Sequence, residues 1–86
     1  MGKTLVIYRI KPGEIGGADD IIAELKNVKN GKFQDAKKEP IGFGVELVKA
    51  GFTVPEKDDA AIEALTKELG KVRGAEEAEL VEMTLL

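Results

Sequence analysis

The order of strand-like and helix-like stretches constrains the fold of this chain more than any other feature. Alternating, β-branched stretches and stretches with apolar residues three or four apart follow each other as strand, helix, strand, strand, helix, strand. Within 86 residues, this order predicts two βαβ-like halves joined by a hairpin. We therefore expect an α+β, ferredoxin-like βαββαβ sandwich, with a four-stranded antiparallel sheet and two helices on one face.

The four expected strands span residues 4–10, 32–39, 45–54 and 78–86. In the first strand, Val6, Tyr8 and Ile10 fall on one side and would face the core. Lys11-Pro12-Gly13 would end this strand. The second strand is polar, so we expect it to be solvated. The third has apolar residues at alternate positions, as a half-buried strand requires.

Capping residues predict where the two helices begin and end. Asp19 would cap the first helix, and Asn30-Gly31 would end it, with the glycine in a left-handed conformation. Asp58 or Asp59 would cap the second helix. Its apolar stripe would pack on the sheet, and Gly70 or Gly74 would lie near its end.

Composition excludes several classes of function. The chain has no cysteine, histidine or serine, so it cannot carry a Ser-His-Asp or Cys-His nucleophilic pair. Zinc sites and disulfides are excluded on the same grounds. We expect a single domain over residues 1–86, too small for an enclosed cofactor cavity, and hence no cofactor. Because the sequence has no catalytic nucleophile or acid-base constellation, we also expect no enzyme activity.

The sequence predicts a cytoplasmic protein without a membrane partner. No run approaches the roughly 18 apolar residues of a membrane span, and the first residues lack a signal-peptide pattern. The 13 basic and 16 acidic residues give a net charge of −3, which argues against a nucleic-acid partner. Abundant lysine and glutamate, with few thermolabile residues, favour a thermophilic source.

Three acidic pairs are candidates for acid-base or cation-binding roles: Asp19-Asp20, Asp58-Asp59 and Glu76-Glu77. None matches an EF-hand loop. Two of the pairs fall at expected helix starts, where the helix dipole stabilises negative charge. A structural role explains them better, and we expect no metal site.

Gly42-Phe43-Gly44 is the most informative local motif. Flanking glycines permit backbone angles closed to other residues and leave Phe43 without neighbouring side chains. The ring would then stand exposed on a tight turn and anchor the chain in a partner's pocket. Alternatively, the glycines only shape the turn and Phe43 packs inward. The apolar residues Leu85 and Leu86 likewise either complete the sheet or contact a partner.

RNA-recognition motifs share this element order and carry base-stacking aromatic residues on their third strand. Here Ile41 stands where that motif has a basic residue, and Val45 stands where it has a further aromatic residue. We therefore expect no direct contact with nucleic acid. An RNA-binding domain remains an alternative, as does a small-molecule-binding regulatory domain with a pocket at a dimer interface.

The segment Pro40-Ile41-Gly42-Phe43-Gly44-Val45, with the strand and acidic turn that follow it and Lys11-Pro12 at the end of the first strand, resembles the exchange domain of translation elongation factor 1-beta. The resemblance covers essentially the whole chain and is greatest for the short archaeal form. It implies a guanine-nucleotide exchange factor that binds the GTPase elongation factor 1-alpha, speeds GDP release and allows GTP to reload.

By this resemblance, Phe43 inserts into the nucleotide-binding domain of the GTPase, and Pro40, Ile41, Gly42 and Gly44 shape the contact. Eukaryotic members carry a lysine near the C-terminus that reaches the magnesium and phosphate region. This sequence has Leu85 at that position and no basic residue after Arg73, so that mechanism does not carry over. Exchange needs no catalytic residue, because a protein that binds the empty GTPase more tightly weakens GDP binding by the same factor.

Overall fold

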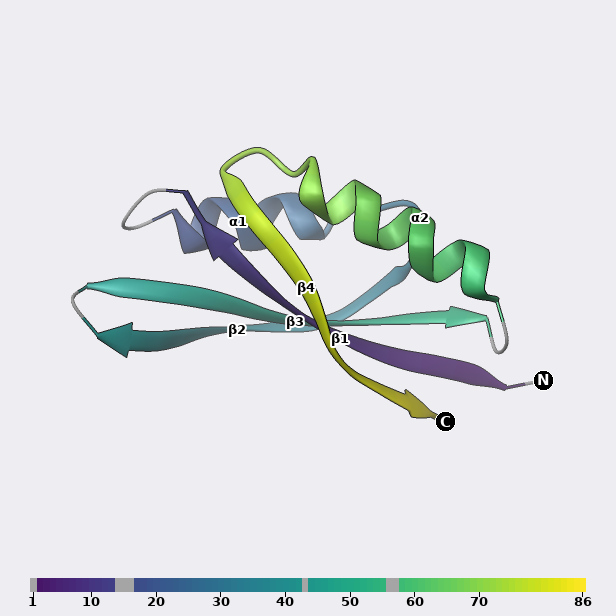
Figure 1. Cartoon of the computed structure of the whole chain (residues 1–86). Coiled ribbons are helices and arrows are strands. Elements are labelled where there is room, and N and C mark those ends of the chain that lie inside the picture. The colour runs from purple at the N-terminus through teal and green to yellow at the C-terminus, as the bar shows by residue number, and fades with distance from the viewer. Residues whose placement is uncertain (1, 14–16, 43, 56–57) are drawn as a thin grey trace.

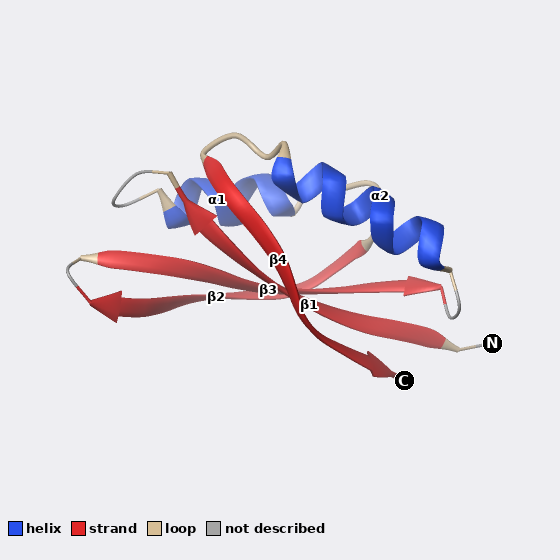
Figure 2. Cartoon of the chain, in the orientation of Figure 1, coloured by secondary structure: helices blue, strands red, loops and turns tan. Residues whose placement is uncertain are grey.

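The computed structural model describes residues 2–13, 17–42, 44–55 and 58–86. Its six elements are β1 (Lys3–Pro12), α1 (Ala18–Leu25), β2 (Lys32–Gly42), β3 (Val45–Pro55), α2 (Asp59–Gly70) and β4 (Ala75–Leu85). The strands form one antiparallel sheet in the order β2-β3-β1-β4, and both helices lie on the same face of it (Figures 1 and 2). The expected ferredoxin-like architecture is confirmed.

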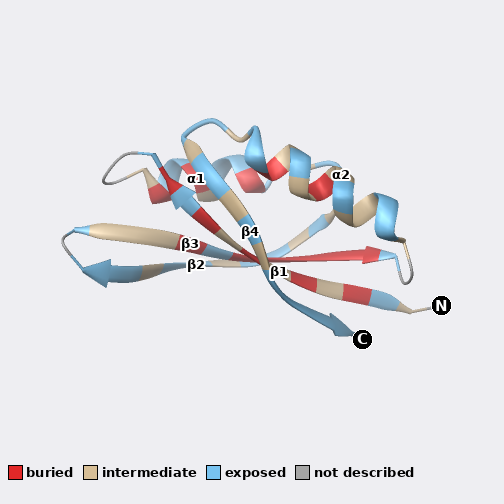
Figure 3. Ribbon diagram, in the orientation of Figure 1, coloured by how far each residue is buried: buried red, intermediate tan, exposed pale blue. Residues whose placement is uncertain are grey.

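The core lies between the helices and the two central strands, β1 and β3. As the alternation predicted, Val6, Tyr8 and Ile10 are fully buried on the helix-covered face. The facing residues are Val48, Ala50, Phe52 and Val54 of β3, and Ile21, Leu25, Leu65 and Leu69 of the helices (Figure 3). Burying each of the larger side chains contributes about 1.5–3 kcal/mol, so these two strands and two helices carry most of the stability.

Three aromatic rings pack edge to face within this core. The centroid of Phe52 lies 6.2 Å from that of Tyr8 and 5.8 Å from that of Phe33 on β2. The Tyr8 hydroxyl lies 2.7 Å from Oγ1 of Thr66, which itself donates to the carbonyl of Ile62 at 2.8 Å. Burial raises the pKa of Tyr8, and its hydrogen bond to Thr66 offsets only part of that rise.

The second helix begins as expected, and the first does not. Asp58 caps α2, and its carboxylate accepts a hydrogen bond from the backbone N–H of Ala61 at 3.0 Å. The N-cap residue of α1 is Gly17, so the prediction for Asp19 is wrong. Asp19 lies inside the first turn of α1, and its carboxylate lies 3.2 Å from Nζ of Lys38 on β2.

The predicted end of the first helix is also wrong. α1 ends at Leu25, five residues before Asn30. Gly31 does not have the positive φ of a left-handed cap; it lies where the chain passes against α2. A Cβ atom at this position would lie 2.9 Å from Cδ2 of Leu65. Close packing against α2 therefore requires this glycine.

The turn between α1 and β2 is held by a side chain of α2. The Glu68 carboxylate accepts hydrogen bonds from the backbone N–H groups of Lys29 and Asn30 and from the Asn30 amide, at 2.9–3.2 Å. Partial burial would raise the pKa of Glu68, but these hydrogen bonds together lower it. Glu68 thus ties the α1–β2 connection to the second helix.

The strands run further than the sequence predicted. β1 continues through Pro12, which pairs with Ala75 after a register shift, and β4 begins at Ala75. Pro40, Ile41 and Gly42 form the end of β2, which pairs with β3 as far as Gly42 and Val45. The glycine-rich motif is therefore the β2–β3 hairpin turn.

Candidate functional site

The β2–β3 hairpin brings together the described members of the predicted binding motif. Gly42 has φ +103° and Gly44 has φ +77°, values that side-chain-bearing residues rarely adopt. The register shifts between Pro40 and Gly42. Ile41 is 54% exposed, and Phe43 lies outside the described residues. The two glycines thus fix the shape of a turn that presents Ile41 to solvent.

The final strand, β4, forms an edge of the sheet and carries the second predicted contact. Leu85 lies opposite Thr4 of β1, and the backbone N–H of Leu86 donates to the carbonyl of Lys3 at 2.9 Å. Their side chains are nevertheless 67% and 68% exposed, and that of Met83 is 55% exposed. The backbone completes the sheet while the apolar side chains remain open to solvent.

These two candidate contacts lie at opposite ends of the sheet. Leu85 pairs with Thr4, which pairs with Val54, whereas the hairpin closes at Val45. Val54 and Val45 are nine positions apart along β3, a distance of about 30 Å at about 3.3 Å per residue. Figure 1 shows the C-terminus and the β2–β3 turn at opposite ends. The structure does not bring them into one site.

The face of the sheet away from the helices bears Leu5, Ile7 and Arg9 of β1, with Lys49 and Lys37 beside them, and is termed the open face. Among the described residues it carries no aromatic ring, because Tyr8, Phe33 and Phe52 all belong to the helix-covered face. An RNA-recognition motif stacks bases on rings of its open sheet. The described part of the chain lacks that feature.

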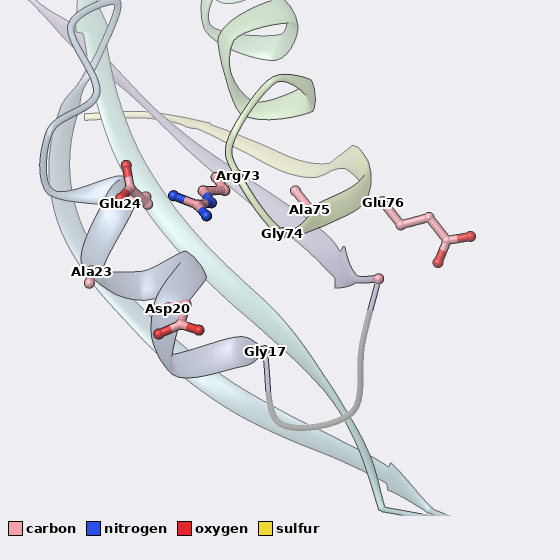
Figure 4. A pocket seen from close by; sticks show the side chains of 9 residues that line it. Gly17, Asp20, Ala23, Glu24, Arg73, Gly74, Ala75 and Glu76 are labelled. Atoms are coloured by element: carbon pink, nitrogen blue, oxygen red, sulfur yellow. The ribbon is translucent and has the colours of Figure 1, made fainter.

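An open cleft of about 1000 Å³ lies between α1 and the α2–β4 turn (Figure 4). Charged side chains from α1 and from the residues that follow α2 line this cleft. Its charged lining residues are Asp20, Glu24, Arg73 and Glu76. The Arg73 guanidinium points toward Glu24, whereas the Glu76 side chain points away from the cleft (Figure 4). Within the described ranges, no three acidic side chains cluster closely enough to hold a metal ion.

The family comparison decides between the classes of function that the sequence left open. The family model for the EF-1 guanine nucleotide exchange domain matches residues 5–86. The chain belongs to this family. It is a guanine nucleotide exchange domain of the elongation factor 1 type, and the match includes the hairpin, both helices and all of the sheet except Lys3 and Thr4.

Archaeal relatives extend this agreement over the full length. Elongation factor 1-beta of Methanospirillum hungatei is 34% identical over 88 aligned residues, which cover all of both chains. The protein of the same name from Methanosphaerula palustris is 29% identical, with 99% of each chain covered. The ACT domain of GTP pyrophosphokinase from Chlorobium tepidum superposes with a TM-score of 0.63 at 18% identity, covering 92% of this chain and 99% of that one. That likeness concerns the fold alone.

For an exchange domain, the surfaces that matter are those that a GTPase can reach. Three surfaces are accessible to a GTPase: the hairpin, the exposed end of β4 and the open face. The cleft between α1 and the α2–β4 turn lies on the helical side of the sheet. No helix of the described residues is long and apolar enough to cross a membrane.

The charged residues of the open face could not be singled out from the sequence, because their proximity depends on the register between strands.

Proposed function

We propose that this chain promotes the release of GDP from the GTPase elongation factor 1-alpha, and thereby its reloading with GTP, by binding through the β2–β3 hairpin. The family match over residues 5–86 carries this proposal. The hairpin supports it, because its backbone shape depends on two glycines with positive φ and because it exposes Ile41. An apolar contact on a preformed turn loses little conformational freedom when it binds.

The exchange requires binding and no covalent chemistry. If the chain binds the nucleotide-free GTPase 100-fold more tightly than the GDP-bound form, linkage weakens GDP binding by the same factor, on the order of 2.7 kcal/mol. The sequence agrees with this mechanism, because it contains no serine, cysteine or histidine that would serve as a nucleophile or a base. GTP then occupies the emptied site by mass action.

Phe43 is the proposed anchor of the contact, with Pro40, Ile41, Gly42 and Gly44 shaping the turn around it. The C-terminal residues Leu85 and Leu86 lie about 30 Å from the hairpin. These C-terminal residues can contact the same GTPase as the hairpin only if the long axis of this chain lies along the surface of the GTPase. The longest dimension of this chain is 43 Å. We assign the primary contact to the hairpin and a secondary contact to the C-terminal strand.

The cellular setting follows from this function. Residues 1–86 act as a single exchange domain in the cytoplasm, where translation takes place. The abundance of lysine and glutamate favours a thermophilic source. Direct binding of nucleic acid is not part of the proposal, because the open face has no ring among its described residues on which a base would stack.

The test is the release of a fluorescent GDP from elongation factor 1-alpha of the same organism, in excess unlabelled nucleotide. We expect a rate that rises with added chain and saturates. Phe43→Ala should weaken the apparent affinity by about 2–4 kcal/mol, which corresponds to roughly 30-fold to 900-fold. Lys67→Ala is the control, since it shortens an exposed side chain of α2, an element assigned to neither contact.

The circular dichroism spectrum of each variant shows whether it is folded. A folded Phe43→Ala chain that binds and accelerates like the unsubstituted chain would remove the hairpin from the mechanism. Failure of the unsubstituted, folded chain to accelerate release from an active GTPase would refute the proposed function altogether.

A further inference from the structure

Three cationic side chains lie side by side in one row across the open face. Arg9 of β1 pairs directly with Lys49 of β3, and Lys49 pairs directly with Lys37 of β2. Their chain neighbours Tyr8, Ile10, Val48 and Ala50 are buried under the helices, so the row faces the opposite way. With neighbouring strands about 4.8 Å apart, the three positions span roughly 10 Å.

This arrangement is unfavourable for the isolated chain. Like charges directly opposite each other on adjacent strands destabilise a sheet. The ion pair that the structure gives this row joins Arg9 to Glu39 at 3.9 Å, the outer limit for such a contact. Among the described residues, no carboxylate lies within 4.0 Å of the ammonium groups of Lys37 and Lys49.

The Arg9 guanidinium also retains an unmet hydrogen-bond donor. Its Nε is buried and has no acceptor among the described residues. A buried donor without a partner costs free energy. Because this Nε is shielded from solvent, the row offers its positive charge, rather than this donor, to an anionic group that approaches the open face.

The residues around the row favour a compact acidic protein surface over a polyanion. Glu79 lies opposite Arg9 on β4, and Glu39 lies two residues from Lys37 on β2, so a nucleic-acid backbone crossing the sheet would meet negative charge at both edges. Half-buried Leu5, Ile7 and Leu47 on the same face offer apolar contact beside the charges. Apolar side chains next to an arginine suit a folded protein partner, because protein interfaces are enriched in arginine.

We infer that the open face, through Arg9, Lys49 and Lys37, binds an acidic surface of the same GTPase that the hairpin contacts. This inference rests on the proposed function and adds the chemistry of a second contact. Lys49 lies four residues along β3 from Val45, about 13 Å from the hairpin turn. One partner can therefore cover the turn and the row together, and electrostatic attraction to the row speeds its approach.

The test compares two charge reversals of equal size in the fluorescent-GDP assay and in direct binding to the GTPase. The variant K37E/K49E reverses two charges of the row. The control K67E/K71E makes the same net change at exposed lysines of α2 and the turn after it, away from the open face. At low salt, we expect K37E/K49E to raise the apparent Kd at least tenfold and the control to raise it less than twofold.

Salt dependence and saturation separate this contact from the hairpin. The Kd of the unsubstituted chain should rise steeply between 50 mM and 300 mM salt, and that of K37E/K49E should change little. At saturating concentration, K37E/K49E should still reach the full exchange rate, because the hairpin is intact. Circular dichroism and thermal melting confirm that both variants are folded.

Each remaining outcome has one meaning. If the unsubstituted chain accelerates exchange and K37E/K49E matches its control, the inference is wrong and the proposed function stands. If the unsubstituted chain does not accelerate exchange, both fail. If polyuridylate binds the unsubstituted chain but not K37E/K49E, and both chains bind the GTPase equally well, the row is a nucleic-acid site and the inference is overturned.

Discussion

Replacement of Gly31 by alanine tests the packing of the α1–β2 connection against the second helix. The added Cβ would lie 2.9 Å from Cδ2 and 3.3 Å from Cδ1 of Leu65, and 3.5 Å from Cβ of Phe52. Carbon atoms in favourable contact are about 3.5–4.0 Å apart, so the Leu65 side chain would have to move by about 0.6 Å. Leu65 is fully buried, and the surrounding core leaves it no solvent to move into.

The expected cost follows from two opposing contributions. Overpacking a dense core typically costs about 1–3 kcal/mol, whereas replacing a glycine restricts the unfolded chain and returns about 0.4–1 kcal/mol. We expect Gly31→Ala to lower the free energy of unfolding by about 1–2 kcal/mol. For a domain of this size, the melting temperature would fall by about 4–8 °C per kcal/mol.

Gly51→Ala is the matched control, since Gly51 also lies against apolar side chains. Its added Cβ would lie 3.4 Å from Cδ1 of Ile7 and 3.6 Å from Cδ1 of Leu5, both on the open face. These half-buried side chains can shift toward solvent, and alanine suits a strand better than glycine. The stability of Gly51→Ala should stay unchanged or rise by up to about 0.5 kcal/mol.

Urea unfolding followed by far-ultraviolet circular dichroism measures both variants, because the chain has no tryptophan for a fluorescence assay. The slope of free energy against urea should match that of the unsubstituted chain, which shows that the same surface unfolds. Equal stability of Gly31→Ala and Gly51→Ala would refute the reasoning, because Leu65 would then repack at no cost.

Three further predictions concern side chains with defined partners. Asp58→Ala should cost about 1 kcal/mol of stability in urea unfolding, because the Ala61 N–H loses its cap, and Asp58→Asn should restore most of it. The pKa of Tyr8 is raised above its ordinary 10.0, so the unfolded state loses this proton at a lower pH than the folded state does. The free energy of unfolding should therefore fall as the pH rises above 10. Tyr8→Phe should remove this pH dependence and should cost about 0.5–1.5 kcal/mol of stability, because the hydrogen bond to Thr66 is lost. The pKa of Glu68 is lowered from 4.5, so its contribution to stability should be complete above pH 4.5. This contribution should decline as the pH falls through the pKa of Glu68 in the folded state. Unfolding curves of Glu68→Gln should lack that decline.

The strand and helix order was enough to predict the fold, because the two helices cover only one face of the sheet and side chains at alternate positions of each central strand point to that face. Tyr8 and its neighbours on β1 followed that rule. Helix ends were less predictable. Asp19 is a good capping residue, but it lies two residues beyond the N-cap and pairs with Lys38, a residue whose position depends on the sheet. Gly31 is likewise set by a tertiary contact that no local pattern reveals.

The candidate site was only partly predictable for the same reason. The hairpin motif is contiguous, so its glycines and Ile41 were visible in the sequence. The row on the open face joins three strands, and its members are separated by 28 and 12 residues in the sequence, between positions 9, 37 and 49. Only the register of the sheet makes them neighbours.

The acidity of β4 has a consequence for the behaviour of the chain at high concentration. This edge strand is 11 residues long and exposes Val81, Met83 and Leu85, which would make it a template for pairing with further copies. The same strand also carries four glutamates, Glu76, Glu77, Glu79 and Glu82, and no basic residue follows Arg73. Two such edges brought together would set carboxylates against each other, so copies of this chain repel one another at an edge whose apolar side chains would otherwise favour pairing.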